Sequence, residues 1–299
     1  MKTKIWLALL AVYIVWGSTY LGIRFAIESI PPFLHAGIRF LISAALILGW
    51  RFFLAKDERP TLRQWRDAGI VGLFLLVGGN GLVSWAEQTV DSGIAALIVG
   101  TVPLWLTLFE AIRPGGMRPG WMAIAGLVVG FVGIAILINP ETLAGAAFRI
   151  DLWGAGALVV ATILWASGSI YARSADVPKS GLMFTGMQMA VGSVGLFLVS
   201  ILRNELSGFD LRDVTTTSWL ALAYLILFGS LIGFVAYGWL LRNAPISLVA
   251  TYAYVNPLVA MFLGAWLANE ILTGRVFIAA AVIISAVVVI NQAKAPQKT

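Results

Sequence analysis

Residues 5–23, IWLALLAVYIVWGSTYLGI, contain no charged side chain. In an α-helix, which rises 1.5 Å per residue, about 20 such residues cross the roughly 30 Å hydrocarbon core of a bilayer. Lys2 and Lys4 precede the run, as in a secretory signal, but the run is longer than a typical signal core. We therefore predict a transmembrane helix that is not cleaved from the chain.

Comparable runs fill the rest of the chain. Besides 5–23, the charge-free runs are 68–86, 92–109, 119–140, 152–172, 180–202, 214–241, 243–269 and 276–293, and a tenth apolar run, 32–54, is interrupted by His35, Arg39 and Arg51. Hydrophobic residues make up 60% of the 299 residues and charged ones 11%, which is more apolar surface than a soluble core can bury. The sequence predicts an all-α integral membrane protein with ten transmembrane helices.

Basic residues between the runs predict the orientation. With a cytoplasmic N-terminus, fourteen Lys and Arg residues lie in or beside cytoplasmic loops and four lie on the opposite side. Loops rich in Lys and Arg stay on the cytoplasmic side, so both termini are predicted to be cytoplasmic. The net charge of +6 is then a matter of topology, and we expect no nucleic-acid partner.

An internal repeat appears when the chain is compared with itself at offsets of 149 and then 154 residues. The most distinctive pairs are Trp16 with Trp165, Trp85 with Trp239, and Pro103 with Pro257. Each half holds five spans, an odd number, so the second half starts on the opposite face of the membrane. We predict two inverted repeats, 1–143 and 150–293, and a cytoplasmic tail, 294–299. Such repeats favour transport by alternating access to a site at their interface.

The sequence offers little for metal or catalytic chemistry. It has no cysteine and one histidine, His35, so we predict neither a metal site nor a cofactor. It also lacks a Gly-x-Ser-x-Gly elbow and a phosphate-binding Gly-Lys-Ser/Thr loop. We predict that the protein is not an enzyme.

Several short motifs resemble one family of transporters. They are YIVWGSTY at 13–20, GIRF at 37–40, SGIAAL at 92–97, AYVNP at 253–257 and NEILT at 269–273. These stretches, with the repeat, resemble the EamA-type members of the drug/metabolite transporter superfamily over essentially the whole chain. The first half departs from the pattern, because Gly116 stands where the repeat would place the counterpart of Glu270.

The resemblance implies a ten-helix basket in a bacterial inner membrane. A central cavity would be bounded by helices 1, 3, 4, 6, 8 and 9, while helices 5 and 10 would serve in packing. Exporters of amino acids are known in the family, so the expected substrates are small neutral metabolites, above all aromatic amino acids, threonine and methionine.

Aromatic and small polar residues at matching places in the two halves are candidates for the substrate site. Such a lining offers apolar surface with hydrogen-bonding groups, which suits a zwitterion. The competing interpretation is an aromatic belt at the membrane interface, above all for Trp85. The predicted substrate-binding residues are Trp16, Ser18, Thr19, Tyr20, Arg39, Asn80, Trp85, Trp105, Trp165, Ser169, Tyr171, Tyr252, Tyr254 and Asn256.

Arg39 and the two repeated prolines each allow two interpretations. An arginine within hydrocarbon is costly, so Arg39 either binds a substrate carboxylate or anchors its helix by satisfying carbonyl groups. Pro103 and Pro257 are predicted inside helices, where a proline frees a carbonyl and kinks the helix. Such kinks serve either gating and substrate binding or packing alone.

Other functions and assemblies remain open. A sugar-phosphate transporter would need several cations in its cavity, and an organic-cation transporter would need a carboxylate in the first helix. A non-transport scaffold is a third alternative. His35, Glu87 and Glu110 are expected in solvated positions at helix ends, which predicts weak proton coupling or none. Gly126, Gly130 and Gly133 predict close helix contact within a monomer or across a homodimer.

Overall fold

The computed structural model describes residues 2–112, 120–138, 151–244 and 251–292, and every regular element among them is helical. The elements of the first half of the chain are α1 (Lys2–Ala26), α2 (Pro32–Gly49), η1 (Trp50–Leu54), α3 (Leu62–Gly72), η2 (Leu73–Gly81), α4 (Leu82–Ala86), α5 (Ser92–Val99), α6 (Val102–Ile112) and α7 (Trp121–Ile138). Those of the second half are α8 (Leu152–Tyr171), α9 (Gly181–Leu202), η4 (Leu211–Asp213), α10 (Thr216–Tyr224), η5 (Leu225–Ile232), α11 (Gly233–Asn243), α13 (Tyr252–Leu267) and α14 (Gly274–Gln292).

The helices are long and apolar enough for a membrane protein with many spans. Within the described residues, seven helical runs meet the length and hydropathy of a span, and three shorter apolar helices accompany them. The run Pro32–Leu54 is among the seven despite its charges. Large apolar side chains such as Trp153, which is 82% exposed, cover the outside, as expected of a surface that faces lipid. The prediction of an all-α membrane protein is confirmed.

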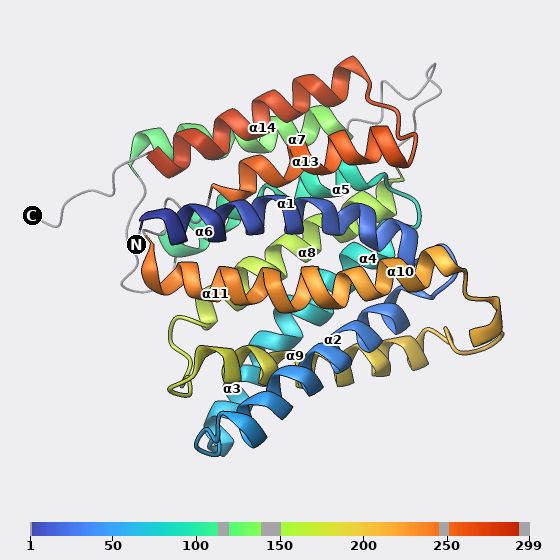
Figure 1. Cartoon of the computed structure of the whole chain (residues 1–299). Coiled ribbons are helices and arrows are strands. Elements are labelled where there is room, and N and C mark those ends of the chain that lie inside the picture. The colour runs from blue at the N-terminus through green and yellow to red at the C-terminus, as the bar shows by residue number, and fades with distance from the viewer. Residues whose placement is uncertain (1, 113–119, 139–150, 245–250, 293–299) are drawn as a thin grey trace, which may run out of the picture.

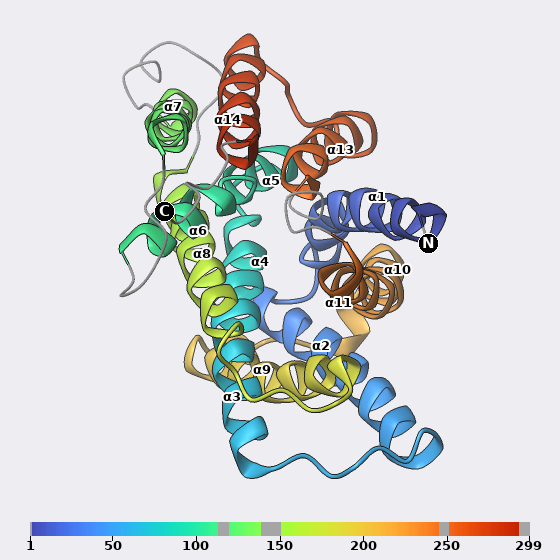
Figure 2. The same cartoon turned by 90° about the vertical axis from the view of Figure 1, so that its left-hand side faces the viewer.

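Helices that are far apart in the sequence lie side by side. α2 packs along α9, and α7 packs along α14, at opposite edges of the molecule (Figures 1 and 2). Between these edges, α1 contacts α13 and the continuous rod of α10, η5 and α11. The first residues of α1 and the last of α14 lie at the same end of the bundle (Figure 1).

Glycines allow helices from different parts of the chain to approach closely. A methyl group at Gly72 of α3 would overlap the backbone carbonyl oxygen of Gln188 on α9. On α7, Gly130 accommodates Leu104 and Gly133 accommodates Ile283 of α14. These two glycines of the small-residue face are therefore occupied by contacts within one chain.

Two helix starts are capped by carboxylates from distant segments. α2 begins after Pro31, whose side chain cannot cap it, and the Glu205 carboxylate accepts hydrogen bonds from the amides of Phe33 and Leu34 at 3.3 and 2.9 Å. At α5 the Glu270 carboxylate accepts hydrogen bonds from the amides of Ser92 and Gly93. Acidic groups suit these places because unpaired amides and the helix dipole favour negative charge.

We expect Glu205→Ala to lower the stability of the protein by about 1–2 kcal/mol, because two amides at the start of α2 lose their acceptor. Thermal unfolding in detergent measures the change. Glu28→Ala is the control, since Glu28 is an exposed carboxylate in the loop just before α2. Equal unfolding midpoints for the two variants would show that Glu205 does not contribute as a cap.

Candidate functional site

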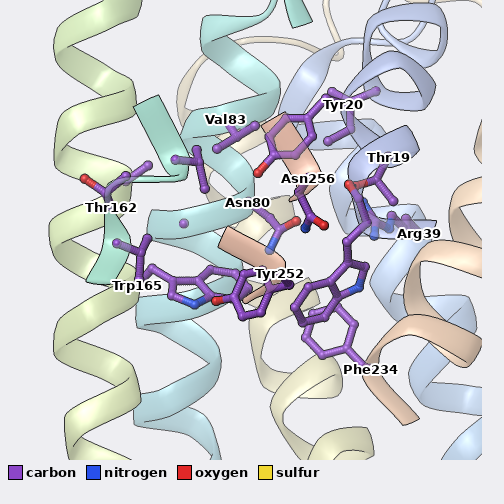
Figure 3. A pocket seen from close by; sticks show the side chains of 16 residues that line it. Thr19, Tyr20, Arg39, Asn80, Val83, Thr162, Trp165, Phe234, Tyr252 and Asn256 are labelled. Atoms are coloured by element: carbon purple, nitrogen blue, oxygen red, sulfur yellow. The ribbon is translucent and has the colours of Figure 1, made fainter. Parts of the chain in front are cut away.

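A cavity of about 80 Å³ lies at the centre of the bundle, several times the roughly 10–15 Å³ that one water needs by the same measure. α1, η2, α4, α5, α6, α8, α11 and α13 contribute to its wall, and α2 adds Arg39. It is lined by Trp16, Thr19, Tyr20, Ile23, Arg39, Gly79, Asn80, Val83, Val99, Val102, Ala161, Thr162, Trp165, Phe234, Tyr252 and Asn256. Thr162 and Trp165 reach it from one side, and Arg39, Thr19 and Phe234 from the other (Figure 3).

Aromatic rings form one wall of the cavity. The ring centroids of Trp16 and Trp165 are 6.4 Å apart, with the rings edge to face, and Trp16 also contacts Tyr252 at 5.5 Å and Phe234 at 5.3 Å. Trp16 is only 8% exposed, so it does not belong to an interfacial belt. The repeated tryptophans therefore approach the cavity from α1 and from α8 and meet edge to face in its wall.

Each of these tryptophans packs against a glycine from the other half of the chain. A methyl group at Gly233 would overlap Trp16 Nε1, and one at Gly79 would lie 2.7 Å from Trp165 Cε3. Trp16 Nε1 donates a hydrogen bond to the carbonyl oxygen of Gly229, at 3.3 Å. Gly79 and Gly229 lie in the π-helical segments η2 and η5, a helical form that often marks functional sites.

Arg39 brings a positive charge to the cavity. It is 2% exposed, and its Nε donates a hydrogen bond to Ser230 Oγ of η5 at 2.9 Å. The ion pairs found among the described residues do not involve Arg39. A guanidinium so far from water, without a carboxylate, is suited to an anionic group that enters the cavity.

The neutral polar groups of the wall supply acceptors. Thr19 Oγ1 donates to the carbonyl oxygen of Trp16 at 2.7 Å, and Thr162 Oγ1 donates to that of Val159 at 2.6 Å. The hydrogen of each hydroxyl is already donated to a backbone carbonyl, so the oxygen can act only as an acceptor toward a ligand. Asn80 Nδ2 donates to the carbonyl oxygen of Leu75 at 3.3 Å, which turns one amide donor away from the cavity as well.

The structure brings eight of the predicted binding residues into the cavity wall and leaves others outside it. Those in the wall are Trp16, Thr19, Tyr20, Arg39, Asn80, Trp165, Tyr252 and Asn256, and those outside it are Ser18, Trp85, Trp105, Ser169 and Tyr171. The side chain of Tyr254 is outside the described part of the chain.

The five residues outside the wall have other neighbours. Ser18 Oγ is hydrogen-bonded to Tyr224 Oη at 2.5 Å, and Ser169 Oγ donates to the carbonyl oxygen of Trp165. Tyr171 Oη donates to Asp67, the Arg203 guanidinium lies over the Trp85 ring at 5.7 Å, and Trp105 packs edge to face on Phe131. Serines bind their own helices because a hydroxyl reaches a carbonyl one turn back, so their spacing alone did not predict the lining.

The two prolines lie differently from each other. Pro257 is inside α13, as predicted, whereas Pro103 is the second residue of α6, after a break at Gly100 and Thr101. The prediction of an interior proline is therefore wrong for Pro103, because the helix already breaks ahead of it. Gly100 packs against the carbonyl oxygen of Ala253. This oxygen has no helical hydrogen bond from position 257, because Pro257 has no backbone N–H. The two interruptions thus pack on each other.

Sequence reasoning missed several residues of the wall. Phe234 is the counterpart of the predicted residue Asn80 at the offset of 154, so the repeat carried a signal for it. Thr162 corresponds to Tyr13 at the offset of 149, which was not a predicted binding residue, so the repeat gave no signal for Thr162. Ser230, the hydrogen-bond partner of Arg39, and the π-helical turns had no such signal. Local hydrophobic periodicity does not distinguish an α-helix from a π-helical turn.

Comparison with known proteins agrees with this architecture. The EamA-like transporter family matches residues 3–139 and 152–292. The chain is 39% identical to the uncharacterized inner membrane transporter YedA of Escherichia coli over 96% of its own length and 90% of the relative's. It is 24% identical to the uncharacterized transporter YoaV of Bacillus subtilis, over 88% of each chain.

A solved crystal structure has the same fold, with a TM-score of 0.65 and 21% identity over 97% of this chain and 98% of the other. Taken with the family match over both parts of the sequence, these similarities agree with the helical bundle. The chain belongs to the EamA-like transporter family.

Proposed function

We propose that this protein exports amino acids across a bacterial inner membrane, by alternating access to the central cavity. Ten spans, arranged as inverted repeats over 1–143 and 150–293, would place both termini in the cytoplasm. The observation that carries the substrate class is Arg39, a buried cation that faces an aromatic cavity and makes no ion pair among the described residues.

Each part of an amino acid has a complementary partner in this cavity. The carboxylate would bind the Arg39 guanidinium, whose planar donors match its two oxygens. The ammonium group would meet lone pairs of Thr19 and Thr162 and the faces of Trp16 and Trp165. An apolar or aromatic side chain would fit the space between the rings, which favours aromatic amino acids and methionine.

The contacts between the halves support alternating access. Trp16 sits on Gly233, and its counterpart Trp165 sits on Gly79, the counterpart of Gly233. The family model also matches the two parts of the chain separately. Two similar halves with reciprocal contacts could exchange conformations, so that the cavity opens to one side and then to the other.

The charges of the wall do not favour the alternative substrates. Among its lining residues, Arg39 is the one cation, which is too little to neutralise a sugar phosphate. The same lining residues include no aspartate or glutamate to attract an organic cation. A scaffold without transport would have no use for a polar cavity in the middle of its bundle.

Efflux from liposomes tests the proposal. Purified protein is reconstituted into liposomes preloaded with one radiolabelled amino acid at a time, and release is compared with empty liposomes. We expect efflux of an aromatic amino acid, threonine or methionine, and its loss in Trp16→Ala and in Trp165→Ala. Trp153→Ala is the control, because Trp153 is 82% exposed on the outside of α8.

Efflux of no amino acid above empty liposomes would contradict the proposed substrate class. An equal loss of efflux in Trp153→Ala would show that the effect of Trp16→Ala and Trp165→Ala is not specific to the cavity. Retained folding of each variant is checked by its unfolding midpoint in detergent.

A further inference from the structure

Glu87 is a buried carboxylic acid beside the cavity. It follows α4 directly, and it is 0% exposed. Within the described part of the chain, neither of its carboxylate oxygens has a hydrogen-bond partner. Val83, which lines the cavity, stands one helical turn earlier, about 6 Å along the axis. The expectation that Glu87 and His35 are solvated at helix ends is wrong, since both are fully buried.

The surroundings compensate a negative charge at this place only in part. From α1, Arg24 Nη1 donates at 2.7 Å to the backbone oxygen of Glu87 and so does not bond to its carboxylate. Tyr20, four residues before Arg24 on α1, lines the cavity. Residues close to Glu87 along the chain, Val83, Ala86 and Val90, belong to a buried apolar cluster.

Another acidic group stands nearby. Glu270, between α13 and α14, influences the ionisation of Glu87 and of Asp91. Its own oxygens accept hydrogen bonds from the Ser92 and Gly93 amides at 2.8 and 3.0 Å, which holds the side chain at the start of α5.

The other helices near α4 bring ionisable groups, and none of them forms a hydrogen bond with the Glu87 carboxylate in the described part of the chain. From α8, Asp151 accepts a hydrogen bond from Thr89, and from the end of α9, Arg203 lies over Trp85. From α2, His35 Nδ1 is 3.2 Å from the carbonyl oxygen of Pro32.

Burial raises the pKa of Glu87 well above its ordinary value, and repulsion from Glu270 raises it further, while Arg24 lowers it in part. A carboxyl group that is fully buried, with no hydrogen-bond partner among the described residues, favours its neutral form. Entry of water at this end of the bundle would solvate the carboxylate and allow it to ionise.

We propose that Glu87 is a proton-binding site that couples proton movement to the transport of substrate. This inference rests on the proposed function, because coupling needs a transported substrate. The end of the bundle near Glu87 first opens to water, and the carboxylate then binds one proton. This end closes afterwards, with the proton bound. The proton leaves toward the cavity when the opposite end opens. With both termini cytoplasmic, the end near Glu87 faces the periplasm, so the proton moves inward as the substrate moves outward.

Glu87→Gln separates coupling from transport, because glutamine has the shape of the protonated acid and cannot release a proton. In liposomes without a gradient, we expect the variant to exchange labelled for unlabelled amino acid as the native protein does. An imposed pH gradient is expected to stimulate net transport severalfold by the native protein and not at all by the variant. Glu28→Gln, a change at an exposed carboxylate near the same end, should respond like the native protein.

The pH dependence of stability tests the proton site without any substrate. A raised pKa means that the folded protein binds the proton more tightly than the unfolded chain does. The native protein therefore loses stability as the pH rises above the ordinary value of 4.5, whereas Glu87→Gln does not. We expect the unfolding midpoint of Glu87→Gln, measured relative to that of the native protein, to increase from about pH 5 to about pH 8. The midpoint of Glu28→Gln relative to the native protein should not change over this range.

The outcomes distinguish the two proposals. Full stimulation of Glu87→Gln by the pH gradient would overturn the proton site and leave the exporter intact. So would a midpoint difference that does not change with pH, or a variant that fails to fold, since either result would mean that the carboxylate is ionised in the native protein. Absence of exchange by the native protein, with the midpoint difference as expected, would instead contradict the proposed substrate.

Discussion

Arg39→Gln is expected to reduce amino-acid efflux about 100-fold while leaving the protein as stable as before. Removing one partner of a buried charge pair costs about 2–5 kcal/mol, and each 1.4 kcal/mol corresponds to about tenfold in binding. The guanidinium makes no ion pair among the described residues, so the ion pair lost in the variant is the one with the substrate. Efflux rates and unfolding midpoints are measured on the same preparations.

This measurement separates the two interpretations of Arg39. If it only anchored α2 through Ser230, then Arg39→Gln would lower the unfolding midpoint, and Ser230→Ala would lower it too. Efflux near the native rate from a destabilised Arg39→Gln variant would contradict the carboxylate site. Arg39→Lys retains the charge and loses the planar pair of donors, so it should transport at an intermediate rate.

Gly72→Ala is expected to destabilise the protein by about 3 kcal/mol, the upper part of the range for overpacking. The added methyl group would overlap the backbone carbonyl of Gln188, and a backbone cannot rotate away as a side chain can. α3 and α9 would have to separate along their contact. The unfolding midpoint in detergent and the yield of folded protein in membranes both report the effect.

Gly156→Ala is the matched control. Gly156 also lies within a helix, α8, but no atom lies within 4 Å of the added methyl group. Alanine has the higher helix propensity, so this variant should be as stable as the native protein or slightly more stable. An equal loss of stability in Gly72→Ala and Gly156→Ala would show that overlap between α3 and α9 is not the cause of the destabilisation at position 72.

The sequence predicted the helical membrane fold and the central aromatic pair because both depend on patterns that the chain carries locally. Apolar length indicates a span, and matching positions of Trp16 and Trp165 indicate a shared environment. Ser18 and Ser169 could not be placed, because a hydroxyl in a helix has the option of bonding to its own backbone.

The surroundings of Glu87 could not be predicted either. A residue just after a helix is usually solvated. Only the three-dimensional fold shows that Glu87 is buried, with Arg24 of α1 bonded to its backbone oxygen and Glu270 near enough to influence its ionisation. The π-helical segments η2 and η5 depend on tertiary packing in the same way. η2 contains Gly79, which packs against Trp165, and η5 ends directly before Gly233, which packs against Trp16.

The distance along the chain between Arg39 and Ser230 has a consequence for biosynthesis. The two residues are separated by 191 positions, so α2 enters the membrane long before its partner η5 has been translated. Until then the guanidinium has to reach the headgroups or draw water into the bilayer, since no hydroxyl of η5 is there to accept its hydrogen. The insertion machinery must therefore accommodate the first half with Arg39 still hydrated. The guanidinium becomes buried only after the second half has been synthesised.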